Sequence, residues 1–335
     1  MINKKAFEIQ FNWIFVLVAG ATILIFFTFV LVKQKGVAET STKSTVLKSI
    51  EAIVTGAGIG TDTTNIITVI DSDIEIGCNR ISVGGVSKQY QSLILFAPDL
   101  IKGDRIVTQT LDFSVPYRAT NLLYITSQQV RYIIIGDDNL AKDMNKTMPS
   151  SLKKEFYKEI PTIDNKNNYK VRLLIFDNTD VNGINLRNLE KMPDSDVTAI
   201  KVSGDNEKGT IEFYQKEGYS WSSKGRANYI GKSALIGAAY ADATDTYECN
   251  MQNAFHRLNL VTKIYIDRTK KMLSSNLADK PRCKDFYNNA LTQLNKIYVA
   301  SSKFNELNVN TIANAAKSLV NENKNAQIYS CTLIY

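Results

Sequence analysis

An uncharged segment near the amino terminus, FNWIFVLVAGATILIFFTFVLV, constrains this chain more than any other feature. It runs from Phe11 to Val32, 22 residues without a charged side chain. A helix needs about 20 apolar residues, each rising about 1.5 Å, to cross the roughly 30 Å hydrocarbon core of a bilayer. The apolar region of a cleaved signal peptide is shorter, about 7–15 residues. The segment therefore predicts a single transmembrane helix, with the lipid bilayer as the partner of Phe11–Val32.

Basic residues and cysteines bear on the orientation of this helix. Lys4 and Lys5 precede the apolar segment, and Lys33 and Lys35 follow it. The positive-inside rule compares the basic residues on the two sides of a helix, and here the two counts are nearly equal. Four dispersed cysteines without a C-x-x-C pair are typical of an oxidising compartment. We therefore expect the amino terminus inside the cell, and the bulk of the chain outside the cytoplasm at the cell membrane.

The remainder of the chain, roughly 300 residues, is long enough for one large or two ordinary domains. Its composition, with 44% hydrophobic and 22% charged residues, is typical of a folded protein. The predicted fold class is α+β or mixed: an N-terminal transmembrane helix, a mostly antiparallel β-rich region, a small α/β layer and a C-terminal helical hairpin. The expected boundaries are a cytoplasmic head at 1–10, a transmembrane helix at 11–32, a helical stalk at 33–60, a β-rich region at 61–129, an α/β region at 130–243 and a helical region at 244–335.

Local patterns place the individual elements. Short runs rich in β-branched and aromatic residues, bounded by turn residues, predict strands between 64 and 135. Beyond them, strands alternate with helical patterns, which indicates a partly parallel sheet. The helices expected there are SSLKKEFYKEI (150–160) and NLRNLEKM (185–192). Apolar residues at helical spacing then predict helices over 249–273, 285–303 and 309–320, followed by a terminal strand, AQIYSCTLIY, at 326–335.

The predicted helices restrict how the cysteines pair. Cys249 begins one helix and Cys283 lies just past its end, so about 24 residues at 1.5 Å rise separate them by more than 30 Å. Because the two Cα atoms of a disulfide lie within about 7 Å, a bond between Cys249 and Cys283 is disfavoured. Two connectivities remain open: Cys249–Cys331 with Cys78–Cys283, or Cys78–Cys249 with Cys283–Cys331.

His256 is the one histidine of the chain, and the helical pattern places it nearly opposite Leu258, on the exposed side. A site with several histidines around a metal ion is thereby excluded within one chain. Nucleophilic schemes that need a histidine base would all have to use this residue. We assign no catalytic and no cofactor-binding residue.

Aspartates that follow predicted strands are the candidate metal ligands. The carboxyl ends of strands are where open α/β sheets bind ligands, and carboxylate oxygens suit Mg²⁺ or Ca²⁺. Turns after strands are also rich in aspartate for structural reasons, which gives a competing interpretation. The candidates for a divalent cation are Asp137, Asp138, Asp177, Asp180 and Asp205.

Net charge and glycine motifs give no further site. The formal net charge is +7, but acidic residues stand among the basic ones, whereas a nucleic-acid-binding surface concentrates basic residues. We therefore expect no nucleic-acid partner. GAGIGTDTT (56–64) lacks the spacing of a dinucleotide fingerprint, and GRANYIGKS lacks the first glycine of a phosphate loop, because Arg226 stands in its place.

The amino terminus resembles that of archaeal type IV pilins. A short basic head ends at the small residue Ala6, and a long apolar helix follows. The resemblance implies cleavage between Ala6 and Phe7, with the apolar helix packed in a filament core. Glu8 stands second after this cut, whereas the family's glutamate would stand fifth, at Phe11. The overall plan also resembles uncharacterised archaeal single-pass surface proteins, which implies no activity.

From these features we expect a non-enzymatic, membrane-anchored extracytoplasmic protein with a structural or interaction role at the cell surface. Its partners would be other proteins or envelope polymers. One alternative is a pilin-like filament subunit processed at Ala6–Phe7. The other is a membrane-anchored metal-dependent hydrolase or ligand-binding module that uses the aspartates at strand ends.

Overall fold

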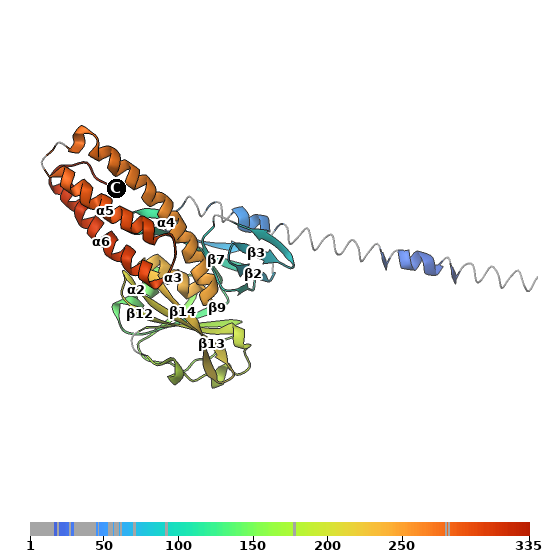
Figure 1. The fold of residues 1–335 in the computed structure, drawn as a ribbon. Helices are drawn as coiled ribbons and strands as arrows, with labels where there is room; N and C mark the ends of the chain where they lie inside the picture. The colour runs from blue at the N-terminus through green and yellow to red at the C-terminus, as the bar shows by residue number, and fades with distance from the viewer. Residues whose placement is uncertain are drawn as a thin grey trace, which may run out of the picture.

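Three β-sheets and a group of long helices make up this mixed α/β fold, seen in a computed structural model (Figure 1). The structure describes residues 17, 18, 20–26, 28, 29, 45, 47–52, 56, 60, 62–69, 72–90, 93–176, 179–278, 280 and 282–335.

Two four-stranded sheets pack face to face in the amino-terminal half. The first has the order β4-β3-β2-β6 and is antiparallel throughout. The second has the order β1-β7-β8-β5, antiparallel except for the β5–β8 pair. The strands of the first sheet are β2 (Ile74–Gly77), β3 (Arg80–Val83), β4 (Val86–Gln89) and β6 (Leu100–Ile101). Those of the second are β1 (Thr63–Thr68), β5 (Leu95–Phe96), β7 (Arg105–Ser114) and β8 (Arg118–Ser127).

Strand β8 is buried on both faces, because successive side chains of a strand point to opposite sides. Leu123 and Ile125 join the core between the two small sheets. Leu122 and Tyr124, one position away in each case, join the main core on the other side. The second sheet is therefore an inner layer of the molecule.

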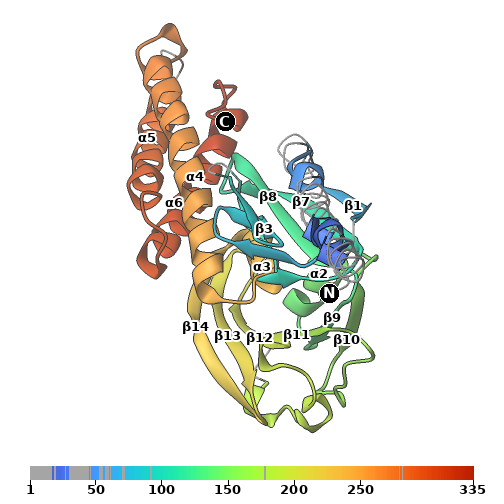
Figure 2. The ribbon, with the colours of Figure 1, turned by 90° about the vertical axis from the view of Figure 1, so that its right-hand side faces the viewer.

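A six-stranded sheet forms the next layer and has the order β10-β9-β11-β12-β13-β14 (Figure 2). Its first four strands are parallel to one another, whereas β12, β13 and β14 are joined by antiparallel pairing. The strands are β9 (Val130–Ile135), β10 (Lys153–Tyr157), β11 (Lys170–Ile175), β12 (Val197–Gly204), β13 (Lys208–Glu217) and β14 (Ser220–Ile230).

Both faces of the six-stranded sheet are covered. One face contributes Tyr132 and Ile134 to the main core, and the other contributes Ile133 and Ile135 to a separate core. This separate core lies under the loops and short 3-10 helices η1 (Val181–Gly183), η2 (Arg187–Leu189) and η3 (Asp194–Asp196). Parallel strands buried on both sides are expected to be continuously apolar, and β9 fits that expectation except at Arg131, which pairs with Glu155 and Asp164.

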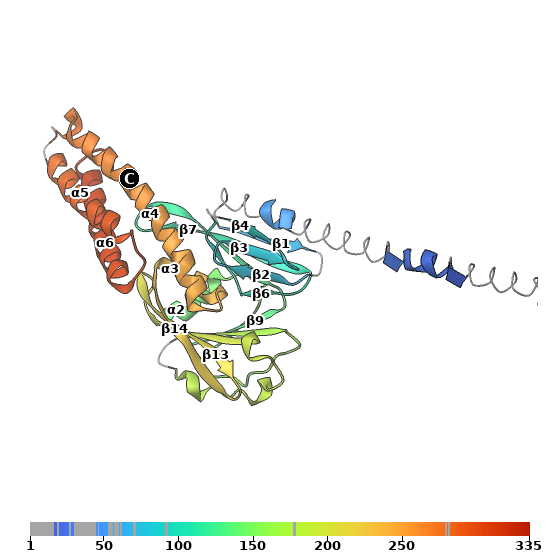
Figure 3. The ribbon, with the colours of Figure 1, turned by 45° about the vertical axis from the view of Figure 1, so that its right-hand side comes forward.

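Helices α2 to α6 complete the fold. The 30-residue helix α4 starts at the six-stranded sheet and runs past the small sheets to the far end of the helical bundle (Figure 3). Helix α5 packs beside it there, and α6 packs against α5. The helices are α2 (Asn139–Thr147), α3 (Gly231–Tyr240), α4 (Thr244–Leu273), η4 (Asn276–Ala278), α5 (Cys283–Ala300) and α6 (Glu306–Ile328).

Helix α3 approaches strand β5 so closely that only glycine fits at one position. A Cβ atom on Gly237 would lie 2.9 Å from three ring carbons of Phe96. The Phe96 ring is itself held between Tyr124 and Tyr247, with ring centroids 5.8 and 5.6 Å away. This contact sets the distance between α3 and the inner sheet.

The predicted fold class is wrong in its N-terminal transmembrane helix. Within the part of the chain that the structure describes, no helix is long and apolar enough to cross a bilayer. Residues 11–16, 19, 27 and 30–32 of the predicted transmembrane segment lie outside the described residues. In the predicted stalk, residues 47–52 are helical, and Leu47 and Ile50 pack into the core between the small sheets.

The helical elements also differ from the predictions. The segment 150–160 contains strand β10, which pairs in parallel with β9, rather than a helix. The segment 185–192 contains only the short helix η2. The expected C-terminal hairpin is a three-helix arrangement, because α6 continues to Ile328, and residues 329–335 form no strand.

Candidate functional site

A polar pocket of about 360 Å³ lies at the edge of the six-stranded sheet where strands β11 and β12 begin. Its walls come from the β5–β6 loop, the starts of β11 and β12, strands β13 and β14, and the loop between α3 and α4. We call it the polar pocket. The lining residues are Asp99, Leu100, Lys170, Ser195, Asp196, Thr198, Gln215, Lys224, Asp242, Ala243, Thr244 and Asp245.

A buried ion pair forms the floor of the polar pocket. The Lys170 ammonium donates to Oδ2 of Asp242 over 2.6 Å, and the side chains are 4% and 7% exposed. The hydroxyl of Thr198 donates to the other carboxylate oxygen over 3.4 Å. Removing two charges from water is costly unless they are paired and hydrogen-bonded, as they are here. The pair therefore fixes the first residue of β11 against the loop before α4.

Asp99 stands at the rim of the pocket. Its backbone N–H donates to Oδ2 of Asp242 over 3.0 Å, which ties the β5–β6 loop to the ion pair. Burial of its carboxyl raises the pKa of Asp99 to about 6, and the negative charge of Asp242 adds to the rise. The residue as a whole is exposed, so the surrounding chain crowds the carboxyl without covering it. This carboxyl can therefore exchange a proton near neutral pH.

Arg172 holds the loop that carries Asp242. Its side chain, which is 1% exposed, donates to the carbonyl oxygens of Ala238, Ala239 and Ala241 at the end of α3. A cation at the C-terminal end of a helix is favourable, because the last carbonyl groups there have no helical partners. Burial lowers the pKa of Arg172, and the charge of Asp242 opposes that shift. Arg172 is thus a positioning residue for the floor of the pocket.

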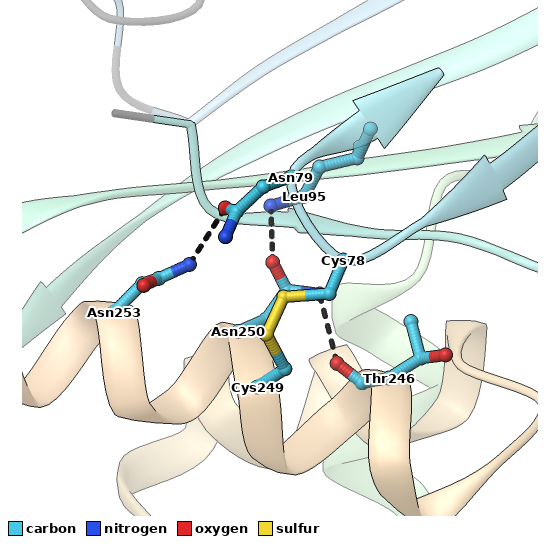
Figure 4. The surroundings of a disulfide bond; sticks show 7 residues. All are labelled: Cys78, Asn79, Leu95, Thr246, Cys249, Asn250 and Asn253. Atoms are coloured by element: carbon cyan, nitrogen blue, oxygen red, sulfur yellow. Dashed lines mark hydrogen bonds between the residues drawn. A yellow bond between two sulfur atoms is a disulfide. The ribbon is translucent and has the colours of Figure 1, made fainter. Parts of the chain in front are cut away.

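A disulfide anchors helix α4, whose first two residues line the polar pocket. Cys78, in the turn between β2 and β3, is bonded to Cys249 in the second turn of α4, with Cα atoms 6.1 Å apart (Figure 4). Next to it, Oδ1 of Asn250 accepts the backbone N–H of Leu95, and Nδ2 of Asn253 donates to Asn79. These contacts join the start of α4 to both small sheets, so the β5–β6 loop cannot move away from α4 freely.

Asp196 supplies a second, less satisfied carboxylate. The residue is 8% exposed and lines the pocket. The Ser195 hydroxyl donates to its Oδ1 over 3.4 Å. Within the described residues, its Oδ2 has no hydrogen-bond donor. The oxygen without a protein donor is free to accept a hydrogen bond from a ligand in the pocket.

The described aspartates among the predicted metal ligands lie at the other end of the sheet. Asp137 forms ion pairs with Lys142 and Lys158, and the bond from Lys142 lowers its pKa. Asp138 caps α2 by accepting the N–H of Ala141 over 2.6 Å. Both residues follow β9, as expected, but each has a local structural partner.

Two of the remaining predicted ligands are also engaged locally. Asp180 caps η1 through the N–H of Asn182, and Asp205 accepts the backbone N–H groups of Glu207 and Lys208 in the β12–β13 turn. Asp177 lies outside the described residues. Among those that are described, no group of three or more His, Cys, Asp or Glu side chains is arranged to hold a metal ion.

The cysteines pair in one of the two connectivities that the sequence left open: Cys78 with Cys249, and Cys283 with Cys331, whose Cα atoms are 5.7 Å apart. The disfavoured bond between Cys249 and Cys283 is absent, because the intact helix α4 separates them. His256 is exposed on α4, as predicted.

Sequence reasoning did not find the polar pocket, although strand β11 carried a signal. Lys170 and Arg172 stand two positions apart in an otherwise apolar strand, so both point to the same face. Two basic residues at this spacing in a strand with neighbours on both sides require buried acceptors.

Comparison with known proteins identifies no relative of this chain. No protein-family model, curated protein or solved structure matches it.

Proposed function

We propose that this chain is an extracytoplasmic binding protein whose polar pocket recognises a small polar ligand. The observation that carries the proposal is the buried pair of Lys170 and Asp242, which four separate parts of the chain hold in place at the floor of a pocket. Ligand pockets combine a preformed shape with a few fixed polar groups. A structural ion pair alone would need no pocket above it.

The disulfides support the cellular location in the proposal. Both are consistent with an extracellular or otherwise oxidising environment, because cytosolic thiols are usually kept reduced. Labelling intact cells with a membrane-impermeant lysine reagent tests the location. We expect exposed lysines such as Lys303 to be modified in intact cells. Modification only after lysis would refute an extracytoplasmic location.

A blocking substitution tests the binding role. Gln215 is half-buried at the pocket wall, so Gln215→Trp fills space without removing a charge. Four five-carbon probes cover the charge classes: 1,5-diaminopentane, 5-aminopentanoate, glutarate and 1,5-pentanediol. We expect calorimetry to detect binding of at least one probe to the wild-type protein and not to Gln215→Trp. The proposal fails if none of the four binds, or if the blocked variant binds equally well.

A further inference from the structure

We infer that the polar pocket is selective for a small organic cation that carries a primary ammonium group. This inference rests on the binding function proposed above and names the class of ligand. It follows from three properties of the lining: the balance of charge, the hydrogen bonding of the Asp196 carboxylate, and the distribution of the carboxylates around the cavity.

The lining carries more negative than positive charge. Four carboxylates face the pocket, those of Asp99, Asp196, Asp242 and Asp245, against the ammonium groups of Lys170 and Lys224. Lys170 is already engaged, since it donates to Asp242 and to the carbonyl oxygen of Ser195 over 3.2 Å. The remaining charge is therefore acidic, and an anionic ligand would be repelled.

One carboxylate oxygen of this lining has no donor from the described chain. Asp196 is more than nine-tenths buried, and within the described chain its Oδ2 has no donor, while Oδ1 has only the long bond from Ser195. A primary ammonium offers three N–H donors and a full positive charge, and so matches such a carboxylate. Binding would satisfy the acceptor and neutralise the charge together.

The carboxylates come from separate elements around the cavity. Asp99 lies in the β5–β6 loop, Asp196 in η3, and Asp245 in the first turn of α4. Hydroxyl and amide groups of Thr198, Thr244 and Gln215 lie among them. A volume of about 360 Å³ is in the range of small-molecule pockets. The shape therefore suits a molecule with a cationic end and a polar body.

The test compares matched probes on the whole protein by calorimetry at pH 7.5. We expect 1,5-diaminopentane to bind, and glutarate and 1,5-pentanediol, which have the same carbon chain, to show no binding. Asp196→Asn should weaken diaminopentane binding by about tenfold or more, because a charge-assisted hydrogen bond is lost. Asp245→Asn, at an exposed position, should weaken it as well, and serves if Asp196→Asn does not fold.

Asp137→Asn is the matched control. It removes the same charge at the opposite end of the sheet, so binding should not change beyond a small general electrostatic effect. Equal binding by wild type, Asp196→Asn and Asp245→Asn would overturn the inference, as would absence of diaminopentane binding. Preferential binding of glutarate, 1,5-pentanediol or CaCl₂ would also overturn it. Glutarate or pentanediol binding that Gln215→Trp abolishes would leave the proposed binding function standing with a different ligand class.

Discussion

Cys78 and Cys249 lie 6.1 Å apart at their Cα atoms, although 171 positions separate them in the chain. The bond joins the turn between β2 and β3 to the second turn of α4. It therefore links the amino-terminal sheets to the helix that borders the polar pocket, and closes a loop containing most of the β-structure.

Removing this disulfide should loosen the two small sheets from α4. In Cys78→Ser/Cys249→Ser we expect the free energy of unfolding to fall by about 2–5 kcal/mol, because a long loop is no longer constrained in the unfolded chain. Urea unfolding measures this change, and limited proteolysis should cut first within residues 62–127. The matched control is Cys283→Ser/Cys331→Ser, which should leave that region protected. Identical proteolysis patterns for the two variants would contradict the proposed clamp.

Stability should depend on pH through Asp99. Its pKa is about 6 in the folded protein, against 3.8 for an ordinary aspartate in water, so the folded state binds more protons between these values. Stability therefore declines as pH rises from about 4 through 6. Asp99→Asn cannot ionise, so its melting temperature should exceed that of wild type by a margin that grows over this range. A margin independent of pH from 4 to 8 would show that Asp99 does not titrate as stated.

Glu155 should show the opposite dependence. Arg131 bonds to both of its carboxylate oxygens, over 2.9 and 2.8 Å, and these bonds are the main reason that the pKa of Glu155 falls to about 2. Its stabilising contribution is thus complete above about pH 4.5 and is lost as pH falls toward 2. We expect Glu155→Gln to cost about 1–3 kcal/mol at pH 7 and progressively less below pH 4.5, measured by urea unfolding. Glu159→Gln, the same change at an exposed position, should cost almost nothing at any pH.

Adding one methyl group to Gly237 should destabilise the core. The new Cβ of Gly237→Ala would lie 2.9 Å from the Phe96 ring, which Tyr124 and Tyr247 prevent from moving away. We expect a loss of about 1–3 kcal/mol in the free energy of unfolding, despite the better helix propensity of alanine. Combining the change with Phe96→Leu should recover part of this loss in a double-mutant cycle. Strict additivity of the two changes would show that the ring contact is not the cause.

Local sequence patterns were sufficient to predict those strands and helices whose conformation is set by residues nearby in the chain. Strands β7, β8 and β9 lie within segments whose β-branched and aromatic residues predicted strands, and α4 follows its apolar spacing. Segment 150–160 shows the limit of this approach. Its lysine and glutamate residues favour a helix by propensity, but parallel pairing with β9 makes 153–157 a strand. That pairing depends on tertiary contacts, which the local pattern does not contain.

The candidate site could not be predicted from the sequence for the same reason. Asp99, Lys170 and Asp242 come from three distant parts of the chain, and only the fold brings them together. The general rule for open α/β sheets directed attention to the carboxyl ends of the strands, at Asp137 and Asp205. The polar pocket lies at the opposite ends of β11 and β12, where the α3–α4 loop and the β5–β6 loop meet.

The disulfide pattern has a consequence for biosynthesis. In chain order, the first cysteine is bonded to the second and the third to the fourth, so the two covalent loops follow one another without overlap. A chain that enters an oxidising compartment amino terminus first presents Cys78 and Cys249 before Cys283 and Cys331. If each newly emerged cysteine bonds to the unpaired cysteine that emerged before it, the native pairs form directly. No later disulfide exchange between the two loops is then required.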